Sequence, residues 1–405
     1  MHRYRGFLTV SIVFLLGFST ARAADYGSVY SLRGWGLTRF TAGPRAAGMG
    51  GVSLATISSR YLNNHNPAQF GALLDVRTTA SFFSQRLGVS AKEGFFRSYY
   101  SNFNSVAAGF PIKRNVGVQF GIVPETISGF RLESKFSLNN FSYTKSIEKK
   151  GGLNTFYFGV GAKILPGFYL GSRVDFLFGK IVEKWALDFE NPSFDDGKNT
   201  FSTKAWGLNI GVGTVVQPTS WLSVGASFWP SRRMRMQSEK KYYRPQITET
   251  VSKNWTYPAK YGGGIAVTLG KKWLMGLDYW TEQWSKFRIE GAANSEMSDE
   301  NRISVGIEMS GSRDRYASFL KKISLRAGYY THELNVLGFK GNDKVTENVG
   351  TFGLGFPFDR GMGSIDFAIE AGTRGKTSVN LYKESIFRFI LFVTGGEHWF
   401  VRHKK

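Results

Sequence analysis

The most regular feature of the chain is an alternation of apolar and polar positions that recurs between residues 76 and 394. In residues 168–180 one face reads Phe, Leu, Ser, Val, Phe and Phe, whereas the other reads Tyr, Gly, Arg, Asp, Leu and Gly. Residues 154–164, 322–330 and 364–372 divide in the same way. A period of two predicts β-strands whose two faces lie in different solvents, so the fold class is all-β.

The polar faces of these strands combine many glycines with charges of both signs. A soluble β-sandwich also alternates, but its solvent face is usually rich in Lys, Glu and Thr. Small residues and paired charges suit a face pressed against a folded segment, so we interpret this face as the lumen of a barrel. The candidate lumen residues are Arg173, Asp175, Asp278, Glu282, Arg302, Glu308, Arg326, Asp366 and Glu370.

Turn spacing indicates that the strands close into a transmembrane antiparallel β-barrel. Short polar or Pro/Gly turns are predicted at 113–115, 165–167, 217–220, 270–272, 311–318 and 358–362. Longer, charged connections are predicted at 86–93, 125–152, 182–200, 231–258, 286–300, 333–347 and 373–384. Six short turns alternating with seven long connections imply about fourteen strands, the layout of a bacterial outer-membrane barrel.

Tryptophans stand near the predicted strand ends, where a membrane girdle places them. Trp221 and Trp273 begin strands beside short turns, whereas Trp229, Trp280 and Trp284 lie toward the long-loop ends. By alternation Trp280 falls on the inward face. The other four are therefore expected to mark the two edges of the bilayer.

The N-terminus has the pattern of a secretory signal peptide. Arg3 and Arg5 precede an apolar run at 7–18, and Ala-Arg-Ala at 21–23 is a cleavage site. A transmembrane anchor is the alternative, but the run is shorter than the roughly 20 residues that a spanning helix needs. The predicted domains are a signal peptide (1–23), an N-terminal segment with a hatch (24–75), the barrel (76–394) and a periplasmic C-terminal tail (395–405).

Residues 43–74 form a Gly- and Ala-rich segment with neither alternation nor a sustained helical period. Because this segment stands directly before the strands, we interpret it as a plug, or hatch, in the lumen. Its cations Arg45 and Arg60 are expected to pair with lumen carboxylates, since unpaired buried charges are costly. The expected partners are Asp278, Glu308 or Glu370.

Composition limits the chemistry. The chain has no cysteine, which excludes disulfides, thiolate metal sites and cysteine nucleophiles. No metalloprotease, serine hydrolase or nucleotide-binding motif is present, and only His332 stands near the rim of the predicted barrel. We therefore expect a non-enzyme without cofactor or metal. His65, in the sequence Asn-Asn-His-Asn-Pro, is either a hydrogen-bonded turn residue or a gating contact with a ligand carboxylate.

The net charge is +22 at pH 7. Nucleic-acid binding is not expected, because the export signal removes the chain from nucleic acid and no binding motif is present. We interpret the positive charge as a source of attraction to anionic lipid head groups near the membrane surface. The alternative is a basic surface exposed to water. Residues 231–241, SRRMRMQSEKK, are predicted to form an outer loop that captures a carboxylate or a lipopolysaccharide phosphate, or else a solvated basic loop. The candidate capture residues are Arg232, Arg233, Met234, Arg235 and Met236.

Several short motifs follow one another along most of the mature chain. They are RAAGMGG at 45–51, Asn66-Pro67-Ala68, a Pro-Gly turn with a glycine-spaced strand in 153–179, Tyr257-Pro258 before 262–269, and Asp278 followed by Trp284-Ser285. In this order they resemble the outer-membrane FadL/TodX family of long-chain fatty-acid and hydrocarbon transporters. The resemblance implies a fourteen-stranded barrel closed by a hatch, with a ligand pocket near the hatch and a sideways exit through the wall. The hatch and ligand residues that it implies are Arg45, Gly48, Met49, Gly50, Gly51, Arg60, His65, Asn66, Pro67 and Ala68.

The resemblance predicts passive, hatch-gated uptake of hydrophobic small molecules such as long-chain fatty acids or hydrocarbons. Two alternatives stay open: a binding, secretion-shuttle or assembly barrel, and a general porin. The expected partners are a hydrophobic ligand, outer-membrane lipid and lipopolysaccharide, and the barrel-assembly machinery.

Overall fold

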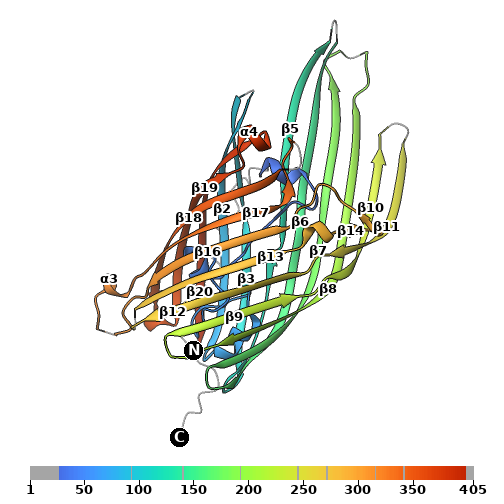
Figure 1. Ribbon diagram of the computed structural model, residues 1–405. Helices are drawn as coiled ribbons and strands as arrows, with labels where there is room; N and C mark the ends of the chain where they lie inside the picture. The colour runs from blue at the N-terminus through green and yellow to red at the C-terminus, as the bar shows by residue number, and fades with distance from the viewer. Residues whose placement is uncertain are drawn as a thin grey trace, which may run out of the picture.

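Antiparallel strands run round a closed barrel in the computed structural model, which describes residues 27–397 apart from 93, 139, 140, 192, 244, 245, 271, 315, 341 and 342 (Figure 1). The predicted signal peptide and the last residues of the predicted tail lie outside these described residues. The barrel has 14 strands, as the turn spacing predicted. It closes where the last strand pairs with the first, from Val76 opposite Glu397 to Ser90 opposite Lys383.

The barrel strands follow one another in chain order, and three of them are interrupted once. They are β2 (Val76–Ala91), β3 (Gly94–Lys113), β4 (Val116–Pro124) with β5 (Thr126–Leu138), β6 (Phe141–Leu165), β7 (Phe168–Phe189), β8 (Gly197–Val216), β9 (Leu222–Trp229) with β10 (Arg232–Tyr242), β11 (Ile247–Tyr257) with β12 (Lys260–Leu269), β13 (Trp273–Glu282), β16 (Glu300–Met309), β17 (Ser324–Leu337), β18 (Lys344–Phe358), β19 (Gly363–Arg374) and β20 (Lys383–Glu397). Each interruption lies at or beside a proline, Pro124, Pro230 or Pro258, which cannot donate a ladder hydrogen bond.

The six predicted short turns all connect strands. The turn after β16 is the longest and carries the short helix α3 (Phe319–Lys322). Most of the predicted long connections were wrong, because the strands continue through them as hairpins. β5 with β6, β7 with β8, and β10 with β11 rise well above the rest of the rim (Figure 1). At the other end β20 continues through Glu397, three residues beyond the predicted barrel boundary.

The outward face of the barrel is apolar, as alternation predicted. Leu208 is 60% exposed and Val305 49% exposed, which suits contact with lipid acyl chains. Trp221 and Trp273 are exposed beside short turns, and Trp280 is buried inside, as expected. Trp229 and Trp284 were placed wrongly: both are buried, at 4% and 0% exposed, and belong to the interior. No helix in the described part of the chain is long and apolar enough to cross a membrane.

The N-terminal residues 27–75 lie within the barrel. Their short elements are η1 (Val29–Leu32), β1 (Leu37–Thr38), α2 (Pro44–Gly48) and η2 (Pro67–Ala72). Inward-facing glycines on strands all round the barrel let this segment approach the wall. A Cβ atom would stand 2.3 Å from Pro67 O at Gly171, 2.1 Å from Leu54 O at Gly225 and 2.3 Å from Met49 C at Gly328.

Replacing Gly328 with Ala is expected to displace residues 48–51, because its Cβ would overlap the backbone at Met49. Such overpacking costs about 1–3 kcal/mol. Trypsin cleavage at Arg45 in the purified protein measures the displacement. The matched control is Gly350→Ala on the neighbouring strand, where the nearest atom to the new Cβ lies at 3.9 Å. Equal cleavage of the two variants would show that the segment does not depend on this contact.

Candidate binding site in the barrel lumen

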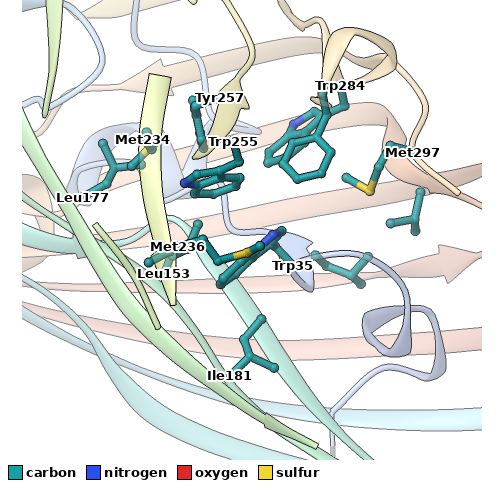
Figure 2. Packing of buried hydrophobic residues seen from close by; sticks show 14 of the residues in the cluster. Trp35, Leu153, Leu177, Ile181, Met234, Met236, Trp255, Tyr257, Trp284 and Met297 are labelled. Carbon is teal, nitrogen blue, oxygen red and sulfur yellow. The ribbon is translucent and has the colours of Figure 1, made fainter. Parts of the chain in front are cut away.

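An apolar cluster fills the outer mouth of the barrel (Figure 2), and we call it the mouth cluster. Its buried members are Tyr30, Trp35, Leu37, Leu153, Leu177, Ile181, Ala205, Met234, Met236, Trp255, Tyr257, Trp284, Phe287, Met297, Leu334, Val336 and Val345. The N-terminal segment supplies Tyr30, Trp35 and Leu37. Trp35 stacks on Trp255 with ring centroids 4.8 Å apart, and Trp255 is only 1% exposed. Side chains of the N-terminal segment therefore fill this apolar part of the lumen.

The predicted capture residues do not share one surface. Met234 and Met236 are buried in the mouth cluster, whereas Arg232, Arg233 and Arg235 are exposed. The segment was expected to be a loop, but it is the strand β10, in which neighbouring side chains point to opposite faces. Arg233 and Arg235 therefore cannot act together with the methionines as one capture site, whereas Arg232 shares their face by alternation.

The cavities below the mouth cluster are small, and charged and apolar side chains line them together. One has a volume of about 70 Å³ and is lined by Arg302, Glu347, Glu370, Arg374 and Arg388 among others. A second, of about 40 Å³, is lined by His65, Glu125, Arg173, Asp175 and Lys260 among others. Arg39 and Phe40 line both. Drug-sized ligands occupy roughly 300–1,000 Å³, so this closed arrangement leaves no room for a long-chain fatty acid.

Arg326 joins the N-terminal segment to the wall of the lumen. Its Nε donates to Glu308 at 2.8 Å, Nη1 donates to Asp366 at 2.6 Å, and Nη2 donates to the Tyr61 hydroxyl at 2.8 Å. Arg45 approaches the same Glu308 carboxylate at 3.1 Å. The Arg326 side chain is 0% exposed and those of Glu308 and Asp366 are 1% exposed, so these three groups are removed from water, whereas Arg45 is partly exposed.

The remaining predicted lumen residues are all buried, but they have different partners. Arg173 pairs with Asp175, which also accepts a hydrogen bond from Trp229 Nε1 at 2.8 Å. Asp278 accepts the backbone N–H groups of Ser53 and Leu54 at 2.6 and 2.9 Å, so this carboxylate holds the N-terminal segment.

Two further lumen carboxylates face cations on the wall. Glu282 lies 4.0 Å from Lys260 Nζ. Glu370 accepts a hydrogen bond from Arg388 at 3.0 Å. Both side chains are therefore held by cations of the barrel itself.

The predicted hatch residues form tight turns against the wall. Gly50 and Gly51 have φ of 69° and 97°, which favours glycine. The N–H of Gly50 donates to Thr351 Oγ1 at 2.9 Å, and the same hydroxyl donates to Gly48 O at 3.0 Å. Met49 is 0% exposed between the glycines of β16 and β17.

The second motif of the segment begins a helical turn on the opposite wall. Asn66 caps η2 by accepting from Ala68 N, and its amide donates to Thr214 O at 3.0 Å. Pro67 is the first residue of that turn and lies against Gly171. Of the predicted cations, Arg45 pairs with Glu308, whereas Arg60 lies beside Gly361 and has no ion pair with the expected carboxylates among the described residues.

His65 is buried between the N-terminal segment and the wall. Its Nδ1 lies 2.9 Å from Ser53 Oγ, and its ring contacts Phe40 and Trp280 with centroids 4.2 and 5.7 Å away. Burial, followed by the positive charges of Lys260, Arg173 and Arg302, lowers the pKa of His65 well below its ordinary value. The imidazole is therefore neutral at pH 7 and serves the packing of the segment.

This lowered pKa predicts a pH-dependent stability. The unfolded chain takes up a proton at His65 below about pH 6.5 while the folded chain does not, so folding stability falls as the pH falls below that value. Between pH 7 and 5 the loss is up to about 2 kcal/mol. Urea unfolding of His65→Gln is expected to lack this part of the pH dependence. An identical profile in both proteins would contradict the assignment.

Sequence reasoning missed a second charged network at the end of the barrel strands. Arg374 Nη1 donates to Glu384 at 2.7 Å and pairs with Glu347, and Arg388 Nη1 donates to Glu347 at 2.9 Å. Glu384 in turn accepts from Ser28 Oγ and from Val29 N, both of the N-terminal segment. Arg388 alternates with the outward-facing residues Phe387 and Phe389 on the closing strand. The alternation rule alone would therefore have placed Arg388 in the lumen.

The barrel wall is not hydrogen-bonded throughout. Residues 94–105 of β3 pair with β2, and β3 meets β4 only from Val106 onward. Beyond Glu125, β5 pairs with β6 and with β1 of the N-terminal segment instead of with β3. A groove of about 450 Å³ lies at this seam, and Tyr100, Ile127 and Gly129 line both the groove and the larger lumen cavity.

Solved structures with a similar fold include a FadL homologue and two toluene transporters. A Pseudomonas aeruginosa FadL homologue matches with 12% identity and a TM-score of 0.61, covering 90% of this chain and 100% of that one. The Pseudomonas putida toluene transporter TodX matches with 14% identity and a TM-score of 0.58, covering 89% and 100%. The Ralstonia pickettii toluene transporter TbuX matches with 16% identity and a TM-score of 0.57, covering 91% and 100%. The predicted FadL/TodX resemblance is therefore confirmed for the fold, and the chain is a multi-pass β-barrel of the outer membrane.

Two of these neighbours are named as transporters, which fits the expectation of a non-enzyme. No group of three or more metal-ligating His, Cys, Asp or Glu side chains occurs within the described residues. Comparison with curated proteins finds no match. The model of one family, described as BamG, matches residues 4–405, which is almost the whole chain. The chain therefore belongs to the BamG family.

Proposed function

We propose that this barrel acts as an assembly component of the outer membrane and that its lumen is filled by its own N-terminal segment. The supporting observation is the occupied lumen: Trp35 and Tyr30 stand in the mouth cluster, and the cavities beneath it measure about 70 and 40 Å³. A barrel whose internal cavities are this small can bind partners at its rim, its outer wall and its turns. The name of the BamG family also points to barrel assembly.

The same observation weighs against a general porin. Conduction needs a continuous water path, and this lumen is crossed by buried ion pairs and by backbone contacts from residues 27–75.

The longest turn at the short-turn end of the barrel offers a surface to a periplasmic partner. Its side chains Tyr316, Phe319 and Leu320 are exposed.

Depletion of the protein in its own cell tests the proposal. We expect the amount of folded outer-membrane barrels, measured by their heat-modifiable mobility in gels, to fall several-fold, because assembly would lack a component. Re-expression of the wild-type chain is the positive control. Normal levels of folded barrels after depletion would contradict the assembly role.

Hydrophobic uptake is the second candidate, and the seam between β3 and β5 favours it. Tyr100 and Ile127 separate the outer groove from the lumen cavity, so a shift of these two side chains and of residues 36–38 would join them. In this case the N-terminal segment is the gate of a lateral path. The toluene transporters among the structural neighbours suggest aromatic hydrocarbons as the first ligands to try.

Uptake of radiolabelled toluene and long-chain fatty acid in the depleted strain separates the two candidates. A transporter predicts reduced uptake with normal barrel assembly, whereas an assembly component predicts the reverse. Because both measurements use the same strain, any general damage to the cell envelope affects them equally and cannot account for a difference between them.

A further inference from the structure

Two lysines face each other on the outward surface of the tall wall above the membrane band. Lys180 on β7 and Lys204 on β8 are direct cross-strand partners, and both are exposed. Side chains of such partners stand about 5 Å apart at Cβ, and like charges placed so are destabilising. Neither lysine has an ion pair within the part of the chain that the structure describes.

Further cations extend the pair into a basic strip. Arg235 on β10 is the direct partner of Trp206, two residues from Lys204, and is exposed on the same face. The nearby acid, Glu239, is already bound by Lys241 at 2.7 Å. The hydrogen bond and charge of Lys241, with the fields of Lys204 and Lys180, hold the pKa of Glu239 below its usual range.

The strip lies directly above the lipid-facing surface. Phe178 and Trp206 form the next outward cross-strand pair below the lysines, followed by Phe176 opposite Leu208. Phe176 is 41% exposed and Leu208 60% exposed. Aromatic side chains above an apolar band mark the interface of a bilayer, so the ammonium groups stand at the level of the outer-leaflet head groups.

A recess at the seam borders the strip. Lys180 and Lys150 line the groove of about 450 Å³, together with Asn102 and Asn154. The exposed apolar side chains Phe103 and Ile122 lie on its membrane side. Lys150 is paired with Glu148 at 2.6 Å, whereas Lys180 has no ion pair among the described residues and is available to an anionic ligand.

We propose that Lys180 and Lys204, with Arg235 beside them, bind the phosphorylated head group of an outer-leaflet glycolipid. Ammonium and guanidinium groups donate charge-assisted hydrogen bonds to phosphate oxygens. Acyl chains of the same lipid would cover Phe176 and Leu208, which ties the site to a membrane lipid and not to a soluble phosphate. Binding of the lipid phosphate relieves the repulsion between the two lysines.

Binding of bisphosphorylated lipid A to the purified full-length protein in detergent tests this proposal, with native mass spectrometry as the readout. The variant Lys180→Gln/Lys204→Gln is expected to bind roughly thirtyfold more weakly, about fivefold for each lysine near an anionic lipid surface. Dephosphorylated lipid A is expected to bind the wild type as weakly as bisphosphorylated lipid A binds this variant. Inorganic phosphate at the same concentration is expected not to compete.

The matched control is Lys321→Gln/Lys322→Gln, which removes the same charge from α3 at the opposite end of the barrel. This control is expected to bind like the wild type, and heat-modifiable mobility verifies that both variants are folded. Equal binding by the two double variants would overturn the proposal. Tight binding of the dephosphorylated lipid, or competition by free phosphate, would also overturn it.

Discussion

Replacing Arg326 with Met is expected to destabilise the folded barrel by about 3–5 kcal/mol, the usual cost of removing one partner from a buried ion pair. The guanidinium is the joint counter-charge of Glu308 and Asp366 and also holds Tyr61 of the N-terminal segment. Arg45 still neutralises part of the Glu308 charge, so the stranded charge is chiefly Asp366. Urea unfolding of the protein in liposomes, followed by tryptophan fluorescence, measures the loss.

Two further variants distinguish a stranded charge from a simple loss of packing. Adding Asp366→Asn to Arg326→Met removes the unpaired carboxylate and is expected to restore part of the stability. Arg232→Met, an exposed arginine on β10, is the matched control and is expected to change stability by less than about 0.5 kcal/mol. If the added Asp366→Asn lowered stability further, the cost would lie in packing and the electrostatic account would be wrong.

Replacing Trp35 with Ala is expected to cost about 3–5 kcal/mol and to open an apolar space in the mouth cluster. Trp35 is 6% exposed and stacks on Trp255, and the residues around it are apolar. Empty apolar cavities of about 150 Å³ stay dry and bind benzene, so the variant is expected to bind toluene where the wild type does not. Saturation-transfer NMR with toluene measures this gain.

The control for Trp35→Ala is Trp185→Ala, whose side chain is 37% exposed on the tall wall. It is expected to leave both stability and toluene binding unchanged. The Trp35 variant also separates the two proposed functions. Faster toluene uptake in cells would support a latent transport path, whereas unchanged uptake with toluene bound in vitro would mean that the lumen has no exit.

The sequence was sufficient to predict the membrane part of the barrel. Between lipid and lumen each strand meets two different solvents, so alternation places Arg173, Asp175 and Asp366 inside without any structure. The same rule would have placed Arg388 of the closing strand. Its partner Glu347 was missed because residues 333–347 were assigned to a loop, although β18 begins at Lys344.

The tall hairpins could not be predicted in the same way. Toward the tips of the hairpins both faces of a strand meet water or polar neighbours, so residues 131–148 and 237–253 lose their alternation while they remain extended. The position of Trp229 was wrong for a related reason. Its indole N–H donates to Asp175 over Gly211 of the intervening strand β8, a contact between residues 54 positions apart that no local pattern shows.

The N-terminal segment and the closing strand meet at one carboxylate. Ser28 and Val29, among the first described residues, bind Glu384 at the start of β20, the strand that closes the circle against β2. The N-terminal segment, which is synthesised before the barrel strands, thus reaches its final position only after β20 has been added. Residues 27–75 must therefore enter the lumen before β20 pairs with β2 and closes the barrel. If the barrel closed first, the N-terminal segment would remain outside it.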